Sequence, residues 1–334
     1  MMKKITFISV LALSVLLTAC RQTPYYKILG EAQGTFYSVT FQGDQTLLSK
    51  AEIDSILDAF DASLSTYKPN SLISKINQSD SGIATDPLFD TMFRKAEEVY
   101  RNTDGAFDIT IAPLVNIYGF GYTEKKETID STLIDSLLHY VGMDKIKLES
   151  GILHKAHKEV KLDGNAIAQG LSVDVTADYL DKKNIQNYIV EIGGELYAKG
   201  KKYNRNWIVS IDKPIEGNMT PGEHTQIKLM PENMAIATSG NYRAFTVIDG
   251  KKYSHSIDPK TGKPVFSNLL SATIAAPDCM SADAYATACM ILGLDKSVKL
   301  IESLPNIEGF FISSGAEGKY DVYYTSGMEK LILK

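Results

Sequence analysis

Cysteine is scarce in this chain, which contains three among 334 residues. Cys20 lies near the N-terminus, whereas Cys279 and Cys289 lie far downstream. A fold held together by disulfides needs several cysteine pairs, so a disulfide scaffold is excluded even in an oxidising compartment. Cys279 and Cys289 flank the start of an expected helix and are expected to be buried thiols; a disulfide between them is the alternative.

A stripe of basic residues is also missing. Lys and Arg number 35 against 40 Asp and Glu, which gives a net charge of −5. Nucleic-acid-binding proteins usually carry a basic surface for phosphates, so the composition argues against a nucleic-acid partner. Beyond the first residues, no apolar run is long enough to span a bilayer, and no membrane-spanning helix is expected there.

The first residues have the pattern of a bacterial export signal. Lys3 and Lys4 precede an apolar stretch over residues 5–17, which is too short for a permanent transmembrane helix. The following Leu17-Thr18-Ala19-Cys20 resembles the lipobox of bacterial lipoproteins, in which cleavage precedes the cysteine and its sulfur receives a diacylglycerol. Cys20 is therefore expected to be lipidated.

This interpretation divides the chain into three parts. Residues 1–19 are predicted to be a lipoprotein signal peptide, residues 20–29 a lipidated cysteine with a tether, and residues 30–334 one catalytic domain. A protein built in this way is expected to be anchored to a bacterial membrane on its periplasmic or extracytoplasmic side. The alternative is an ordinary secretory signal with an incidental cysteine.

The periodicity of apolar residues predicts an α+β fold of mixed or antiparallel sheets with flanking helices. Strands and helices do not alternate regularly, which argues against a doubly wound sheet. Helices are expected over residues 46–64, from Pro87 to Tyr100, over 131–140 with Gly142 as the terminating glycine, over 166–183, and from about Met280 and Lys296. Strands are expected over residues 34–41, 188–192, 207–211, 226–229, 235–238, 245–248 and 271–276, and near Phe310 and Val322.

Eight short islands rich in Gly, Asp, Ser and Thr lie at the boundaries of these elements. They are 34–37, 65–71, 105–110, 162–170, 191–195, 238–243, 254–262 and 281–287. Taken singly, most have a structural explanation. Gly193-Gly194 fits a bulge that ends a strand, Tyr67 fits a core residue, and His255 fits a histidine bonded to a carbonyl.

The last island has the clearest chemistry. Asp283 and Thr287 are four residues apart in an expected helix, so a carboxylate and a hydroxyl share one face near its start. Both are hard oxygen ligands, and Mg²⁺ prefers a few protein oxygens together with water and substrate phosphates. The alternative is an Asp that complements the helix N-terminus and a Thr in the core.

Read together and in order, the eight islands resemble the ApbE family of flavin transferases, from about Gly34 to Gly293. The resemblance implies an ApbE-like, T-fold-like α+β unit that binds FAD and Mg²⁺. It assigns the metal site to Asp283 and Thr287, with Ala166, through its backbone carbonyl, and Ala286. The implied FAD contacts are Gln33, Tyr67, Ala106, Phe107, Asp108, Asp163, Gln169 and Ile257.

Two of these positions depart from the family pattern. Gln169 stands where the family usually has lysine, so a charged contact to the cofactor is replaced by a neutral one. Gln33 stands where methionine commonly precedes the Gly-Thr pair. Neither change touches the expected metal pair, so the altered property is expected to be the contact with FAD.

The implied reaction moves the FMN half of FAD onto a threonine or serine of an acceptor protein and releases AMP. The expected catalytic residues are Asp283 and His255, whose imidazole is a candidate base for the acceptor hydroxyl. Two alternatives stay open: an Mg²⁺-dependent FAD hydrolase that forms FMN and AMP, and a flavin-binding lipoprotein without turnover.

Overall fold

The computed structural model describes residues 23–123, 126–215, 223–241, 245–248, 251–254, 256–316 and 319–334. Cys20 and His255 lie outside the described residues. Among the helices within these ranges, none has the length and apolar character needed to cross a membrane.

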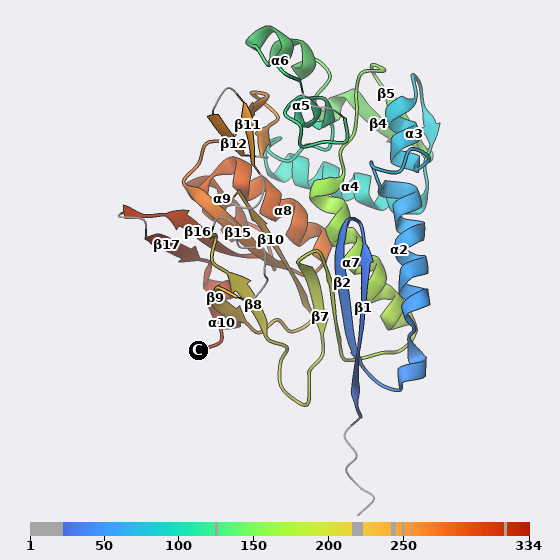
Figure 1. The fold of residues 1–334 in the computed structure, drawn as a ribbon, viewed down its shortest axis with the longest axis vertical. Helices are drawn as coiled ribbons and strands as arrows, with labels where there is room; N and C mark the ends of the chain where they lie inside the picture. Colours follow the sequence, from blue (N-terminus) through green and yellow to red (C-terminus); the bar gives the residue numbers. More distant parts are fainter. Residues whose placement is uncertain are drawn as a thin grey trace, which may run out of the picture.

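A central sheet of eight strands forms the frame of the molecule (Figure 1). Its order is β1-β2-β6-β7-β10-β15-β16-β17, and every neighbouring pair is antiparallel. The strands are β1 (Tyr25–Ala32), β2 (Thr35–Gln42), β6 (Tyr188–Ile192), β7 (Glu195–Lys199), β10 (Met234–Gly240), β15 (Leu269–Ala276), β16 (Glu308–Ser314) and β17 (Tyr320–Tyr324).

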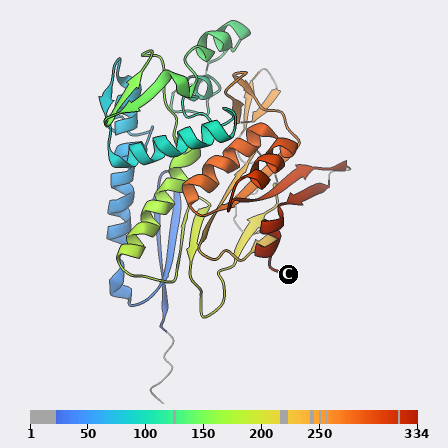
Figure 2. The same ribbon diagram turned by 180° about the vertical axis from the view of Figure 1, so that it is seen from behind.

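Four long helices cover one face of this sheet, as seen from behind in Figure 2. They are α2 (Lys50–Leu64), α4 (Pro87–Asn102), α7 (Asn165–Lys182) and α8 (Cys279–Leu292). The main core lies between these helices and the sheet. A smaller core on the opposite face is covered by β8 (Val209–Asp212), β9 (Thr225–Leu229) and α10 (Ser326–Leu331).

The remaining elements are short and lie mostly above the helical layer in Figure 1. They are the 3₁₀ turns Gln45–Leu47 and Met143–Lys145, the helices α3 (Leu72–Gln78), α5 (Ala112–Ile117), α6 (Ser131–Leu138) and α9 (Leu294–Ser303), and the strands β3 (Ile83–Ala84), β4 (Ile146–Glu149), β5 (Ile152–Lys155), β11 (Phe245–Ile248), β12 (Lys251–Ser254), β13 (Ile257–Asp258) and β14 (Lys263–Pro264). A third apolar cluster under α5 and α6 includes Ile257, which ties this region to the site described below.

Local signals explain where the long helices begin. The Ser49 side chain accepts from the Glu52 amide, and the Glu52 side chain accepts from the Ser49 amide, so two otherwise unpaired donors are satisfied at the start of α2. Asp86 caps α4 in front of Pro87, a residue suited to the first helical position. Asp278 caps α8 by accepting from the Ser281 amide.

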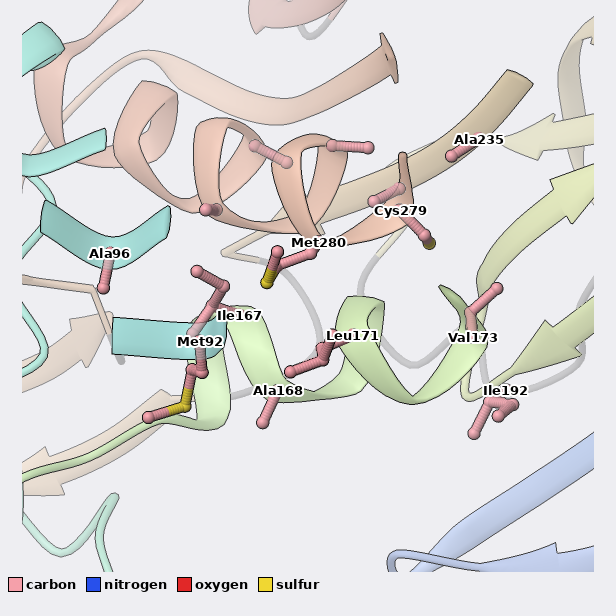
Figure 3. Packing of buried hydrophobic residues seen from close by; sticks show 14 of the residues in the cluster. Met92, Ala96, Ile167, Ala168, Leu171, Val173, Ile192, Ala235, Cys279 and Met280 are labelled. Atoms are coloured by element: carbon pink, nitrogen blue, oxygen red, sulfur yellow. The ribbon is translucent and has the colours of Figure 1, made fainter. Parts of the chain in front are cut away.

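Helices α7 and α8 are buried on several sides, because they pack against each other, the sheet and α4. Figure 3 shows Ile167 and Leu171 of α7 facing Met280 of α8, with Met92 of α4 nearby. The close approach depends on Gly170. A Cβ atom at this position would lie 2.3 Å from the carbonyl oxygen of Cys279 and 2.8 Å from Cβ of Asp283.

The structure confirms the predicted α+β class and most of the predicted elements. β6 has the predicted bounds of residues 188–192, and α7 is shifted by one residue from the predicted 166–183. β7 was not predicted. Gly193 and Gly194 form the two-residue turn of the β6–β7 hairpin instead of a bulge, and both have positive φ, which glycine adopts without steric cost.

Two further expectations need correction, and a third is confirmed. The tether predicted over residues 20–29 overlaps β1, whose residues from Tyr25 onward pair with β2 in the sheet. The helix predicted over 131–140 ends at Leu138, and Gly142 has a φ of 140° and a ψ of 130°, outside the left-handed helical region of a terminating glycine. Cys279 and Cys289 are free, buried thiols, as expected, and form no disulfide. Both lie within α8 and not on either side of its start.

We expect Gly170→Ala to lower the free energy of unfolding by about 1–3 kcal/mol, because the added methyl group overlaps the Cys279 carbonyl. Helix propensity alone predicts the opposite sign, a gain of about 1 kcal/mol. Urea unfolding of the variant distinguishes the expected loss of stability from the expected gain. Asp178→Ala, at an exposed position of α7, is the control. A Gly170→Ala protein that is as stable as the wild type would contradict the close packing of α7 and α8.

Candidate active site

Two cavities meet at the N-terminal end of α7, and Asn165 lines both. The first has a volume of about 410 Å³. Its apolar wall contains two aromatic residues, and its polar wall contains three carboxylates and several hydroxyls. Its lining residues include Phe107, Asp108, Phe120, Asp163, Ala166, Ser239, Ile257, Asp283, Thr287 and Met290. The second cavity has a volume of about 640 Å³ and is lined by Gln33, Gly34, Tyr67, Lys68 and Gln169, among others.

Hydrogen bonds hold two distant chain segments side by side at the first cavity. The Asp163 amide donates to the Ile109 carbonyl at 2.7 Å, and Ile111 and Lys161 form a parallel bridge. The buried Asn77 fixes the second segment, because its side chain accepts from the Leu162 amide at 2.7 Å and donates to the Leu162 carbonyl at 2.8 Å. Segment 105–111 and the start of α7 are therefore presented to the same space.

Asp108 is placed by its own turn. Its Oδ1 accepts from the Thr110 amide at 2.7 Å and from the Thr110 hydroxyl at 2.6 Å. Burial raises the pKa of Asp108 to about 6, although the bonds from Thr110 lower it. Burial also raises the pKa of Asp163, whose Oδ1 accepts from the Asn165 amide at 2.9 Å.

Asp283 and Thr287 lie on the face of α8 that is turned toward the first cavity. Asp283 is only 6% exposed, and its Oδ2 accepts from the Gly170 amide of α7 at 2.9 Å. Burial raises the pKa of this carboxyl. The Thr287 hydroxyl lies 3.2 Å from the hydroxyl of Ser239 at the end of β10. The helix contact thus fixes one oxygen of Asp283 in a cavity wall that also contains these two hydroxyl groups.

The charges around the first cavity are one-sided. Asp108, Asp163 and Asp283 line it, and no Lys, Arg or His is present among the described lining residues. Buried carboxylates without a counter-charge are costly, so this cavity favours a bound cation. The described ranges contain no group of three or more His, Cys, Asp or Glu residues placed to hold a metal ion together. A cation here would need hydroxyl, backbone or ligand oxygens besides Asp283.

The second cavity carries a polar donor in a fixed orientation. Gln33 has a φ of 55°, and its Oε1 accepts from the Ser172 hydroxyl at 3.2 Å. Its Nε2 is buried and has no acceptor among the described residues. The Gln169 amide donates to the Ile192 carbonyl at 3.3 Å, and Tyr67 is 66% exposed at the edge of the cavity. This cavity therefore offers polar side chains in its wall and an accessible aromatic ring.

Comparison with known proteins assigns the chain to a family. The ApbE family profile matches residues 33–311. The chain is 36% identical over 319 residues to the FAD:protein FMN transferase of Haemophilus influenzae, which covers 90% of this chain and 91% of that protein. The chain belongs to the ApbE family. The FAD:protein FMN transferase of Vibrio cholerae is 34% identical over 308 residues, with 88% and 89% covered.

Solved ApbE structures have the same fold. The flavin transferase ApbE from Vibrio cholerae superposes with a TM-score of 0.82 at 31% identity, over 93% of this chain and 100% of that one. The apo form of the Pseudomonas stutzeri flavinyl transferase ApbE gives a TM-score of 0.83 at 29% identity, over 93% and 97%. The family assignment and the α+β fold expected from the eight islands are both confirmed.

The residues implied by the ApbE resemblance divide between the two cavities. Ala106, Phe107, Asp108, Asp163, Ala166, Ile257, Asp283 and Thr287 line the first, and Gln33, Tyr67 and Gln169 line the second. Ala286 is fully buried in the main core and is not among the residues that line either cavity. His255 lies outside the described residues, but its neighbours Ser256 and Ile257 line the first cavity.

Sequence reasoning implied FAD contacts at both Tyr67 and Phe107 but did not show that they line different cavities. It also missed Asn165, although this residue lies inside the island 162–170 and joins the two cavities. Phe120 and Met290 were missed because nothing in their local sequence distinguishes a cavity wall from ordinary core.

We expect Asp108→Asn to remove a pH-dependent part of the stability. The folded-state pKa is about 6, above the value of about 3.9 for an unperturbed Asp. The folded state therefore retains a proton that the unfolded state has lost, and stability falls as pH rises from about 4 to about 6. Asn keeps the acceptor for Thr110 but does not ionise.

Urea unfolding of both proteins across this pH range measures the effect. The wild type should lose up to about 3 kcal/mol relative to Asp108→Asn between the two pH values. Parallel stability curves for the two proteins would show that Asp108 does not titrate in this range in the folded protein.

Proposed function

We propose that this ApbE family member is an FAD:protein FMN transferase that requires Mg²⁺. It binds FAD as substrate, transfers the FMN half to a Thr or Ser hydroxyl of an acceptor protein, and releases AMP. The names of its relatives in Haemophilus influenzae and Vibrio cholerae support the reaction class. Two cavities that share Asn165 suit a substrate with a ring system at each end.

The acidic wall of the first cavity is the observation that carries the Mg²⁺ requirement. A diphosphate would be repelled by Asp108, Asp163 and Asp283 unless a cation lay between them. The Asp283 carboxylate, the Thr287 hydroxyl and the Ala166 carbonyl are the groups assigned to hold Mg²⁺, and these hard oxygens fit its preference. The bound ion would neutralise diphosphate charge and favour departure of the AMP phosphate.

Other groups position the substrate. The N-terminus of α7 faces both cavities; its cap residue Gly164 has no side chain, and Asp163 accepts from the Asn165 amide alone. Such a helix end attracts phosphate. Phe107 and Tyr67, one in each cavity, offer aromatic contact to the two ring systems, and Gln33 and Gln169 add polar side chains to the wall of the second cavity.

The reaction is a substitution at phosphorus. The acceptor hydroxyl oxygen forms a bond to the FMN phosphorus, the bond to the bridging oxygen breaks, and AMP leaves with that oxygen. The hydroxyl proton goes to a base, and His255 is our candidate for this role because an imidazole accepts protons near neutral pH. Positioning and charge stabilisation supply most of the catalysis in such reactions.

One incubation separates this function from its two alternatives. Purified protein is mixed with FAD, Mg²⁺ and a candidate acceptor protein, and the products are followed by mass spectrometry. An acceptor that gains the mass of FMN supports transfer. FMN and AMP without an adduct would indicate hydrolysis, and intact FAD would indicate a carrier without turnover.

We expect Asp283→Asn to reduce flavin transfer at least about a hundredfold, which corresponds to a loss of about 3 kcal/mol of transition-state stabilisation. The Asn side chain can still accept from the Gly170 amide, so the change removes charge more than packing. Thr287→Val should have a smaller effect, because a water can replace one neutral oxygen. Rates are measured at limiting Mg²⁺ and again at raised Mg²⁺.

Asp295→Ala, an exposed position on α9, is the matched control and should retain the wild-type rate. Circular dichroism establishes that each variant is folded. The alternative explanation, an Asp at a helix start and a Thr in the core, predicts lost stability with transfer preserved. A folded Asp283→Asn protein with the wild-type rate at limiting Mg²⁺ would place the metal site elsewhere.

Membrane anchoring through Cys20 is part of the same proposal. The lipobox-like Leu17-Thr18-Ala19-Cys20 supports it, and two or three acyl chains anchor a lipoprotein stably. Cys20→Ser should move the protein from the membrane fraction to the soluble fraction of cells, as followed by immunoblotting. An unchanged distribution would argue against lipidation as the anchor.

A further inference from the structure

A tight turn between β7 and β8 presents an aromatic side chain between two cations. Lys202 and Arg205 form an antiparallel bridge, with amide-to-carbonyl distances of 2.7 and 3.0 Å. Tyr203 and Asn204 between them both have positive φ, of 50° and 64°. A left-handed backbone is unfavourable for a bulky aromatic residue, and such strain is often kept where a side chain has a functional task.

The first residue of β1 supports this turn. The ring of Tyr25 packs edge-on against Tyr203 with 4.7 Å between centroids, and against Trp207 with 5.8 Å. The Tyr25 hydroxyl donates to the Lys201 carbonyl at 2.5 Å. The start of the described chain and the turn therefore form one surface, which we call the basic-aromatic turn (Tyr25 and residues 201–208).

Positive charge is concentrated on this surface, although the whole chain has a net charge of −5. Residues 196–211 contain Lys199, Lys201, Lys202 and Arg205 and no acidic residue. Residues 201–205 are all exposed, and the exposed fraction of Tyr203 is 44%. Ile208, at the end of the same segment, is 54% exposed.

Two carboxylates temper this charge. Lys199 pairs with Asp181 at 2.8 Å, and Lys201 lies 3.9 Å from Glu232. The Lys202 ammonium lies over the Trp207 ring at 5.7 Å. Among the described residues no carboxylate lies within ion-pair distance of Lys202 or Arg205, and both residues are exposed.

The basic-aromatic turn lies at the end of the molecule opposite the two cavities. In Figure 1 the start of β1 and the β7–β8 connection are at the bottom, whereas the start of α7 points to the top. The 18 residues of α7 run between these ends, a length of about 27 Å.

We propose that the basic-aromatic turn docks onto the surface of a membrane containing anionic lipids. Tyr and Trp are enriched at the headgroup level of bilayers, and Lys and Arg are attracted to anionic headgroups. Cys20 is five peptide units from Tyr25, a distance of at most about 18 Å. A lipid on Cys20 therefore brings this end of the molecule, and no other, within reach of the headgroups.

Docking in this way fixes the orientation of the enzyme. The cavities then open about 27 Å or more from the headgroups, so an acceptor side chain must project at least that far from the membrane. This orientation depends on the proposed lipidation. It would restrict the proposed transferase to acceptor proteins whose Thr or Ser reaches the height of the cavities above the membrane.

Vesicle binding without the lipid tests the surface itself. The chain over residues 20–334 with Cys20→Ser retains every described residue. It is mixed with vesicles of phosphatidylcholine alone, or of equal parts phosphatidylcholine and phosphatidylglycerol, and sedimented. Trp207 is the single tryptophan of the chain and is only 4% exposed, with the Tyr25 ring and the Lys202 ammonium packed against it. Quenching of its fluorescence by brominated lipid therefore reports close approach of lipid to this surface.

We expect binding and quenching only with phosphatidylglycerol. One basic residue near an anionic surface changes affinity about fivefold, so Lys201→Glu, Lys202→Glu and Arg205→Glu together should weaken binding at least about a hundredfold. Tyr203→Asn, a residue that tolerates the left-handed backbone, should weaken binding without lowering stability.

Charge reversal at the exposed Lys158, Lys296 and Lys299 changes net charge equally at other places and is the matched control. The proposal would be overturned if the two triple variants bound equally well. It would also be overturned if the Cys20→Ser chain without further changes bound to neither kind of vesicle. Flavin transfer to a soluble acceptor is measured in parallel and should be unchanged in all variants. Failure of transfer with lipid binding intact would affect the proposed function alone.

Discussion

The Gly170 amide donates to Oδ2 of Asp283 at 2.9 Å, across an interface between α7 and α8 that only a residue without a side chain permits. This contact joins two helices that are more than a hundred residues apart in the chain. It fixes how far α8 is shifted along α7. It thereby fixes the position of Asp283 and Thr287 relative to the N-terminus of α7. The cavities exist where they do because this pair of helices packs so closely.

The same contact explains how a carboxylate is kept in a buried place. Burial raises the pKa of Asp283, and the backbone donor from α7 opposes this effect. One hydrogen bond does not replace full hydration, so the carboxylate is most stable with a cation beside it. Asp108 and Asp163 add to the negative charge, and each is held by backbone amides that do not neutralise it. The same uncompensated negative charge thus makes the acidic wall of the first cavity costly to bury and gives it affinity for a cation.

The two ends of the molecule have different surfaces. The end with the cavities carries buried carboxylates and a helix N-terminus, whereas the opposite end carries exposed cations and aromatic rings. Because the sheet strands and α7 run from one end to the other, the fold acts as a rigid spacer between a polar site and the basic-aromatic turn. Net charge does not reveal this separation, since the two surfaces partly cancel in the sum.

The sequence by itself determined the features that depend on near neighbours. The capping pair Ser49 and Glu52, the strand 188–192, and the shared helical face of Asp283 and Thr287 are local, because each follows from spacing within one element. The order of the eight islands also determined the family. Tertiary structure alone decided which islands meet. Tyr67 and Phe107 lie in different cavities, Asn165 joins these cavities, and Tyr25 belongs to β1 and supports a turn 178 residues away. Such contacts arise from strand pairing and helix packing between distant segments, and no local periodicity encodes them.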